Sequence, residues 1–113
     1  MIYHITFRGE WEKALAAGKY KTISLSDEGF IHCSPSEKII ESAEKFFRGK
    51  TNLILLSIDE NKVIPEIVYE DLYGNNFLFP HIYGELNTDS VVNVSELAIN
   101  EKDEFILPAE LIK

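Results

Sequence analysis

Cysteine is almost absent from this 113-residue chain, and long apolar runs are absent altogether. The single cysteine, Cys33, cannot form an internal disulfide bond, which fits a reduced protein that is stabilised by its hydrophobic core. The longest purely apolar run, residues 53–56, has the length of a strand and falls far short of the about 20 residues that span a bilayer. The chain does not open with a basic segment and an apolar stretch, so no secretory signal is expected. We expect a cytoplasmic protein without membrane contact.

Basic residues are also scarce. The chain has 11 lysines and arginines against 19 acidic residues, which gives a formal net charge of −8. This excess repels nucleic-acid phosphates unless a local basic patch overrides it. Only Lys45, Arg48 and Lys50 lie close together, at the end of a predicted helix, where cations stabilise the helix dipole. We therefore expect no nucleic-acid partner, and we attribute the acidity to solubility.

The motifs that would name a reaction directly are missing. There is no G-x-S-x-G elbow of a serine hydrolase and no glycine-rich phosphate loop. The three histidines, at positions 4, 32 and 81, form no local ligand pair such as H-x-x-x-H. We expect no bound metal, and a metal-dependent hydrolase remains only a weaker alternative.

The length and the apolar fraction of 45% indicate one globular domain over residues 1–113. The helical patterns come early and most strands come later, an order that is typical of an α+β fold. The continuous apolar run at 53–58 predicts a central strand buried on both faces. Strands are predicted at residues 2–7, 19–25, 30–33, 53–58, 66–70, 77–83, 91–94 and 104–107, main helices at 10–17 and 35–48, a short helix at 108–112, and turns at 27–29, 59–62 and 74–76.

The clearest local signal is a helix start. Ser34 is placed as the N-cap, Pro35 as the first helical residue, and Glu37 stands three residues after the cap. The apolar residues that follow at helical spacing predict one buried face, and Gly49 then ends the helix. The predicted buried positions are Ile39, Ala43, Phe46 and Phe47 here, and Trp11, Ala14 and Leu15 in the earlier helix.

Each histidine has a hydroxyl-bearing residue two positions later on a predicted strand. The pairs are His4 with Thr6, His32 with Ser34, and His81 with Tyr83. Alternate residues of a strand point to the same face, so each pair offers an imidazole and a hydroxyl together. Three such pairs predict a polar pocket with aromatic walls. Each also has a purely structural explanation, such as a buried strand histidine, a helix cap at Ser34, or an aromatic corner around His81.

Glu70 and Cys33 are two further side chains that can carry chemistry. Glu70 ends a predicted strand, from which its carboxylate can reach a cleft, hydrogen-bond a ribose hydroxyl or stabilise a developing cation. A surface carboxylate is the structural alternative. Cys33 alternates to the face opposite His32, so it is predicted to be a packed core thiol rather than a nucleophile, because nothing nearby would lower its pKa.

The ordered motifs resemble the domain-of-unknown-function 952 family nearly from end to end. The most specific segments are Glu28-Gly29-Phe30-Ile31-His32-Cys33-Ser34 and Phe79-Pro80-His81-Ile82-Tyr83-Gly84. The resemblance also includes Ile2-Tyr3-His4-Ile5, Trp11, Ala14, Gly18, Leu55-Leu56, Tyr69-Glu70 and Glu85-Leu86. The family has no established activity to carry over.

The fold of this family is similar to that of ADP-ribosyltransferases. The resemblance implies a split mixed or antiparallel sheet with two main helices and a cleft for NAD or a related nucleotide. It implies that His4 and Thr6 hold a ribose, that Phe30 or Tyr83 stacks on a ring, and that Glu70 is the catalytic carboxylate. The predicted catalytic residues are Glu70 and His81, and the predicted ligand-binding residues are His4, Thr6, Phe30, His32, Ser34, Pro80, Tyr83 and Gly84.

The sequence thus predicts an ADP-ribosyltransferase-like domain that binds a small molecule, namely NAD or a related nucleotide. A non-catalytic small-ligand-binding module is the alternative. Neither the acceptor nor the oligomeric state is predicted.

Overall fold

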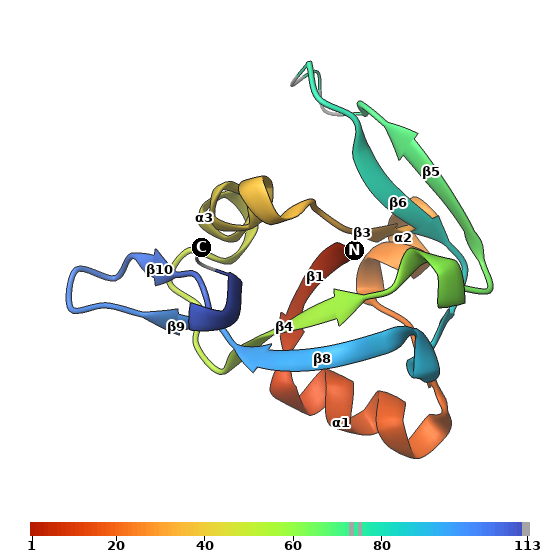
Figure 1. Ribbon diagram of the computed structural model, residues 1–113, viewed down its shortest axis with the longest axis horizontal. Helices are drawn as coiled ribbons and strands as arrows, with labels where there is room; N and C mark the ends of the chain where they lie inside the picture. The colour runs from red at the N-terminus through yellow and green to blue at the C-terminus, as the bar shows by residue number, and fades with distance from the viewer. Residues whose placement is uncertain (73, 75, 112–113) are drawn as a thin grey trace.

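A computed structural model describes residues 1–72, 74 and 76–111, whose strands form antiparallel sheets that curl into a half-barrel (Figure 1). The first sheet has the order β1-β4-β8, and the second has the order β3-β6-β5. Two short pairs, β2 with β7 and β9 with β10, complete the strands. The bounds are β1 (Ile2–Phe7), β2 (Lys19–Tyr20), β3 (Ile31–His32), β4 (Leu53–Ile58), β5 (Glu66–Glu70), β6 (Phe79–Tyr83), β7 (Leu86–Asn87), β8 (Val91–Glu96), β9 (Ala98–Ile99) and β10 (Phe105–Ile106).

Strand β4 is the centre of the molecule. All six of its residues are buried, and β1 and β8 flank it on either side. Ile54, Leu56 and Ile58 belong to one hydrophobic cluster, while Leu53 and Leu55 belong to a second. Alternate side chains therefore fill cores on the two faces of the sheet. The predicted central strand at 53–58 is confirmed.

A β-bridge joins the two three-stranded sheets. The amide of Tyr3 donates to the carbonyl of Ser34, and the amide of Ser34 donates to the carbonyl of Tyr3, each at 2.8 Å. Ser34 lies just after β3, so this bridge holds the end of β3 beside β1. Figure 1 shows β5 and β6 rising from this junction as a twisted ribbon, away from β4 and β8.

The α-helices are α1 (Arg8–Ala17), α2 (Ile23–Glu28) and α3 (Ile39–Phe47). Helix α2 corrects the predicted strand at 19–25, of which only Lys19–Tyr20 is a strand. The side chain of Thr22 caps α2 by accepting a hydrogen bond from the amide of Leu25 at 3.1 Å. Gly29 ends α2 in a left-handed conformation. A threonine cap and a following glycine thus stabilise a helix too short to show a clear apolar period.

The start of α3 was also predicted wrongly. Ser36–Lys38 form a 3-10 turn, and α3 begins only at Ile39. Ser34 is not an N-cap, because its hydroxyl bonds the hydroxyl of Ser42 at 2.9 Å. Its backbone is taken by the bridge to Tyr3, which pulls Ser34 into the sheet.

Two predicted core positions are exposed. Leu15 is 57% exposed, since Trp11 and Ala14 supply the buried stripe of α1. Phe46 is 45% exposed, and its ring lies on the wall of a cavity. Ile39 and Ala43 are buried as predicted, and Phe47 is partly buried against the second cluster.

Every strand pair among the described residues is antiparallel, so the mixed sheet that was the other expectation is not formed there. No helix in the described parts of the chain has the length and apolar character required to cross a membrane.

The remaining boundaries differ modestly from the predictions. The strand predicted at 77–83 begins at Phe79, and the strand predicted at 91–94 extends to Glu96. The strands predicted at 30–33 and 104–107 are shorter and cover Ile31–His32 and Phe105–Ile106. Turns of 3-10 helix form at Glu60–Lys62, Thr88–Ser90 and Ala109–Leu111. Asn75 of the turn predicted at 74–76 and Ile112 of the helix predicted at 108–112 lie outside the described residues.

Gly84, which follows β6, is a position where only glycine fits. Its φ is +156°, and a Cβ built there would lie 3.0 Å from Cβ of Pro65. We expect Gly84→Ala to lower the free energy of unfolding by about 1–3 kcal/mol, because it combines backbone strain with a contact that is too close. The measurement is urea denaturation.

Gly9→Ala is the matched control. Gly9 lies within α1 and a Cβ there would meet no atom within 4 Å, so we expect alanine to raise the stability by about 0.5–1 kcal/mol. Equal effects of the two substitutions would contradict the explanation given for Gly84.

Candidate functional site

A cavity of about 430 Å³ lies at the junction of β1 with the segment that follows β3. Its wall includes five consecutive residues of β1, 3–7, together with His32 and Ser34. The β2–α2 region and helix α3 close the other sides. The lining residues from these elements are Tyr20, Lys21, Thr22, Ser24, Glu28, Ile39, Ser42, Phe46 and Phe47, and α1 and β4 add Glu10 and Leu55.

His4 is buried on this wall and both of its ring nitrogens have partners. Nδ1 lies 2.6 Å from the carbonyl oxygen of His32, and Nε2 lies 2.7 Å from the hydroxyl of Tyr20. A carbonyl can only accept, so Nδ1 carries the proton and Nε2 accepts from Tyr20. Burial lowers the pKa of His4 to about 4, although the bond to the His32 carbonyl opposes the shift. His4 is therefore a neutral imidazole at pH 7.

Tyr20 connects His4 to the hydroxyl of Thr6, which also lies on β1. It is almost completely buried, and its ring packs edge-on against His4 with centroids 5.3 Å apart. Burial raises the pKa of Tyr20, and a hydrogen bond with Thr6 partly offsets that shift. Tyr20, His4 and Thr6 thus form a connected polar group on the cavity wall.

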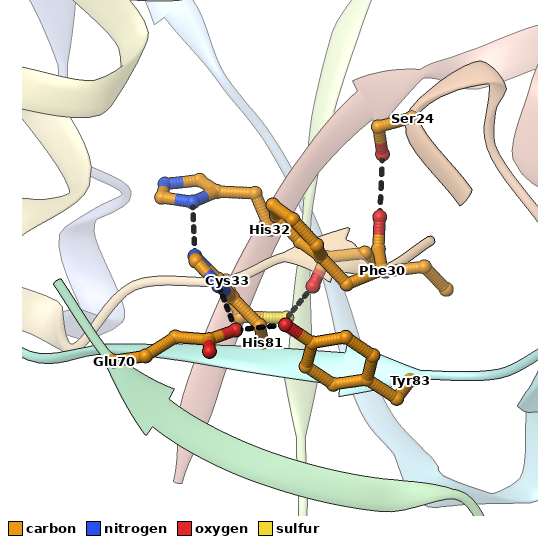
Figure 2. Close-up of polar contacts among 8 residues, drawn as sticks. Ser24, Phe30, His32, Cys33, Glu70, His81 and Tyr83 are labelled. Atoms are coloured by element: carbon orange, nitrogen blue, oxygen red, sulfur yellow. Dashed lines mark hydrogen bonds and ion pairs between the residues drawn. The ribbon is translucent and has the colours of Figure 1, made fainter. Parts of the chain in front are cut away.

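Behind this wall lies a second group, centred on His81 (Figure 2). His81 is fully buried, and its Nδ1 lies 2.8 Å from Oε2 of Glu70. The hydroxyl of Tyr83 donates to the same oxygen. The bonds from Tyr83 and His81 lower the pKa of Glu70, so its carboxylate is ionised at neutral pH. The ring of Phe30 stacks on His81, with centroids 4.0 Å apart and planes 13° from parallel.

His32 links the two groups. Strands β3 and β6 pair His32 directly with His81, and Nδ1 of His32 lies 3.2 Å from Nε2 of His81. Burial lowers the pKa of His32 to about 3, and electrostatic interactions with His81, His4 and Lys45 lower it further. The His32 ring lies on the cavity wall, with Phe46 packed edge-on at 5.4 Å. Glu70, His81 and His32 therefore form a hydrogen-bonded chain that leads to the cavity.

The predicted site residues divide into three sets. The first set lines the cavity. The second set supplies the hydrogen-bonded side chains that lead to His32 and the aromatic ring stacked on them. The third set, Pro80 and Gly84, lies apart, since the carbonyl of Pro80 accepts from the amide of Cys33 and Gly84 packs against Pro65. The cavity set is His4, Thr6, His32 and Ser34, and the second set is Phe30, Glu70, His81 and Tyr83.

These positions separate the predicted site residues that line the cavity from those that do not. Glu70 does not line the cavity, because its carboxylate is held by His81 and Tyr83. Phe30 and Tyr83 do not line it either, because both rings pack in the cluster around His81. Direct ligand contact by these residues, or by Pro80 and Gly84, has no support from their positions.

Sequence reasoning missed Tyr20 and the acidic residues Glu10 and Glu28 on the cavity wall. Tyr20 has no histidine near it in the sequence, and Glu10 resembles an ordinary solvated residue. Glu28 opens the segment Glu28–Ser34, which is the one sequence signal that could have pointed to it. The cavity also holds no metal-binding arrangement: among the described residues, no three histidine, cysteine or acidic side chains are grouped to bind a metal.

The fold and the site define a class: a small α+β protein with a histidine-lined cavity backed by a carboxylate–imidazole chain. Residues 5–94 match the family described as Protein of unknown function (DUF952). The match covers most of the chain, so the protein belongs to this family.

Solved structures of protein CC0527 from Caulobacter crescentus are similar to this chain. Its crystal structure and that of a double mutant are both 34% identical, cover 97% of this chain and 96% of that chain, and superpose with a TM-score of 0.85. Its solution NMR structure is 34% identical over 91% of this chain and 89% of that chain, with a TM-score of 0.77. No match was found among curated proteins.

We expect the thiol of Cys33 to be unreactive in the folded protein. It is fully buried, and burial raises the pKa of its thiol. We expect a thiol reagent such as iodoacetamide to modify Cys33 only after unfolding, because the thiolate is the reactive form. Mass spectrometry with and without denaturant measures this, and rapid labelling of the native protein would contradict it.

The buried His4 should make the fold sensitive to acid. Its folded pKa of about 4 lies below the ordinary value of 6.5, so the unfolded chain binds more protons between these values. The stability that His4 contributes is complete above about pH 6.5 and decreases as the pH falls towards 4. We expect His4 to account for a loss on the order of 2 kcal/mol between pH 7 and pH 5.

His4→Asn is the comparison, because it removes the titration while an amide nitrogen can still donate to the His32 carbonyl. Urea denaturation across this pH range should give a flatter curve for the variant than for the wild type. An NMR titration in which His4 becomes charged above pH 6 would contradict the assignment.

Proposed function

We propose that the cavity binds NAD or a related nucleotide, and that the protein is an ADP-ribosyltransferase-like domain acting at the glycosidic carbon of its ligand. The single observation that carries this proposal is the cavity wall itself. The first strand and the segment after β3 together place His4, Thr6, His32 and Ser34 around one cavity. The split between the two sheets at this point is in keeping with the cleft of an ADP-ribosyltransferase-like fold.

The size and composition of the cavity suit one end of a nucleotide. A volume of about 430 Å³ falls in the range of small-molecule sites, which is about 300–1,000 Å³. Apolar and aromatic side chains such as Phe46 and Leu55 form much of the wall, and a few polar groups interrupt it. This mixture fits a flat ring together with a ribose whose hydroxyls need partners.

The charges on the wall favour an oxidised nicotinamide. Glu10 and Glu28 line the cavity, and Lys21 is the one basic residue among its described lining. A pyridinium carries a positive charge, which two nearby carboxylates attract. The acidic wall therefore supports binding of the nicotinamide end in preference to the phosphates.

In this proposal Glu70 is a positioning residue. It acts on His32 through His81, and the residues of the cavity wall contact the ligand. The cation that develops at the glycosidic carbon would be stabilised by carboxylates of the wall rather than by Glu70.

The second candidate is a ligand-binding module without catalysis. One observation favours it: both ring nitrogens of His4 bond to groups of the protein, as expected for a rigid wall. Such a module would keep the cavity and its ligand but would not release nicotinamide.

Calorimetric titration of the purified protein with NAD, NADP and ADP-ribose tests the proposal. We expect NAD to bind and Thr6→Val to weaken it by about tenfold, because a hydroxyl on the wall is lost without a change of volume. Thr51→Val is the matched control, since Thr51 is exposed and does not line the cavity.

Absence of binding of all three nucleotides at millimolar concentration would refute the proposal. Chromatographic detection of free nicotinamide then separates the two candidates: release supports transfer or hydrolysis, and binding without release supports the module.

A further inference from the structure

Aromatic side chains make up a large part of the cavity wall. Strands β1 and β2 and helix α3 contribute them, and they are Tyr3, Phe7, Tyr20, Phe46 and Phe47. Phe7 and Phe47 pack edge-on with ring centroids 6.0 Å apart, and Phe7 remains 39% exposed. The wall therefore presents aromatic surface that a ligand can reach. The electron-rich face of an aromatic ring attracts a cation and repels an anion.

Two of these rings already have other neighbours. Nζ of Lys45 lies 5.4 Å from the centre of the Phe46 ring, which is within the range of a cation–π contact. Tyr20 is almost completely buried and packs against His4. The rings best placed to contact a ligand are therefore Phe7 and Phe47, whose pair joins β1 to α3.

The histidines on the wall add no positive charge. Burial is the main cause that lowers the pKa of His4 to about 4 and the pKa of His32 to about 3. Both imidazoles are therefore neutral at pH 7. A cationic ligand meets no imidazolium in this cavity.

The charged side chains of the lining differ in how far they are compensated. Nζ of Lys21 lies 3.9 Å from a carboxylate oxygen of Glu85, and Nζ of Lys13 lies 3.7 Å from a carboxylate oxygen of Glu10. Glu28 is exposed, and no basic side chain in the described part of the chain forms an ion pair with it. Glu28 thus gives the cavity a carboxylate whose charge is not compensated.

We infer that the cavity is a binding site for a small organic cation, a pyridinium or a quaternary ammonium, with Phe7 and Phe47 as its aromatic contacts and Glu28 as its counter-charge. Such a cation carries apolar surface that packs against the rest of the wall, where Ile5 and Leu55 lie. The inference goes beyond the proposed function, because the charge is recognised whether or not a nucleotide carries it. Its application to NAD rests on that proposed function.

Two pairs of small probes test the charge directly. In each pair the members have nearly the same shape, and only one of them is a cation: 1-methylnicotinamide against nicotinamide, and choline against 3,3-dimethylbutan-1-ol. We expect calorimetric titration to show that at least one cation binds about tenfold more tightly than its neutral counterpart. The pair that shows the preference identifies the cation as a pyridinium or a quaternary ammonium. Equal binding within both pairs, or no binding of any probe at millimolar concentration, would overturn the inference.

Glu28→Gln and Asp27→Asn form the matched pair of variants. Both residues are exposed at the end of α2, and only Glu28 lines the cavity. We expect Glu28→Gln to weaken binding of the preferred cation by about threefold and to leave its neutral counterpart unchanged, because an exposed carboxylate attracts through solvent. Asp27→Asn should change neither. An equal effect of the two variants on cation binding would contradict the role of Glu28.

Phe47→Leu tests the aromatic contact. Leucine keeps an apolar side chain at this position but has no ring, so we expect the preference for the cation to fall by about threefold or more, while the neutral counterpart still binds. A preference equal to that of the wild type would contradict the role of Phe47. Glu28→Gln decides the question of charge even if Phe47→Leu fails to fold.

The two oxidation states of the dinucleotide separate this inference from the proposed function. The nicotinamide ring of NAD is a cation, whereas that of NADH is neutral, so we expect NAD to bind about tenfold more tightly. If a small cation is preferred and neither dinucleotide binds, the proposed function fails and the cation site stands. If NAD and NADH bind equally and the small probes show no preference, the cation site fails and nucleotide binding stands.

Discussion

The pairing of β3 with β6 is the constraint on which the site depends. It sets His32 opposite His81, so that their rings share a hydrogen bond across the two strands. Strand β5 adds Glu70 on the other side of His81. A shift of one residue in either pairing would turn these side chains to the opposite face of the sheet. The backbone register of a three-stranded ribbon thus fixes the order carboxylate, imidazole, imidazole.

The bridge between Tyr3 and Ser34 gives this chain its place beside the cavity. It draws the residue after β3 against the first strand, where His4 reaches the carbonyl of His32. The same bridge removes Ser34 from the role of helix cap, and α3 begins only at Ile39. Phe46 of this helix lies on the cavity wall. One long-range pairing therefore brings Ser34 to the cavity wall and also separates it from the helix that closes the cavity.

Much of the secondary structure was predictable because it rests on local patterns. The apolar run of β4 and the β-forming residues of β1 indicate strands whatever their partners are, and both were predicted correctly. The errors fell where a tertiary contact competed with a local preference. Ser34 had the sequence of a cap, yet its backbone pairs with β1, and α2 is a helix of only six residues whose cap is a threonine.

Strand alternation alone predicts which residues share a face: His4 with Thr6, His32 with Ser34, and His81 with Tyr83. The same alternation indicated that Cys33 packs in the core. The packing of the strands was needed to show that two of these pairs line the cavity, that His81 and Tyr83 instead hold Glu70, and that Tyr20 joins His4. The reason is physical: alternation fixes the direction of a side chain relative to its own strand, while hydrogen-bond partners, burial and proton positions depend on which strands lie next to one another.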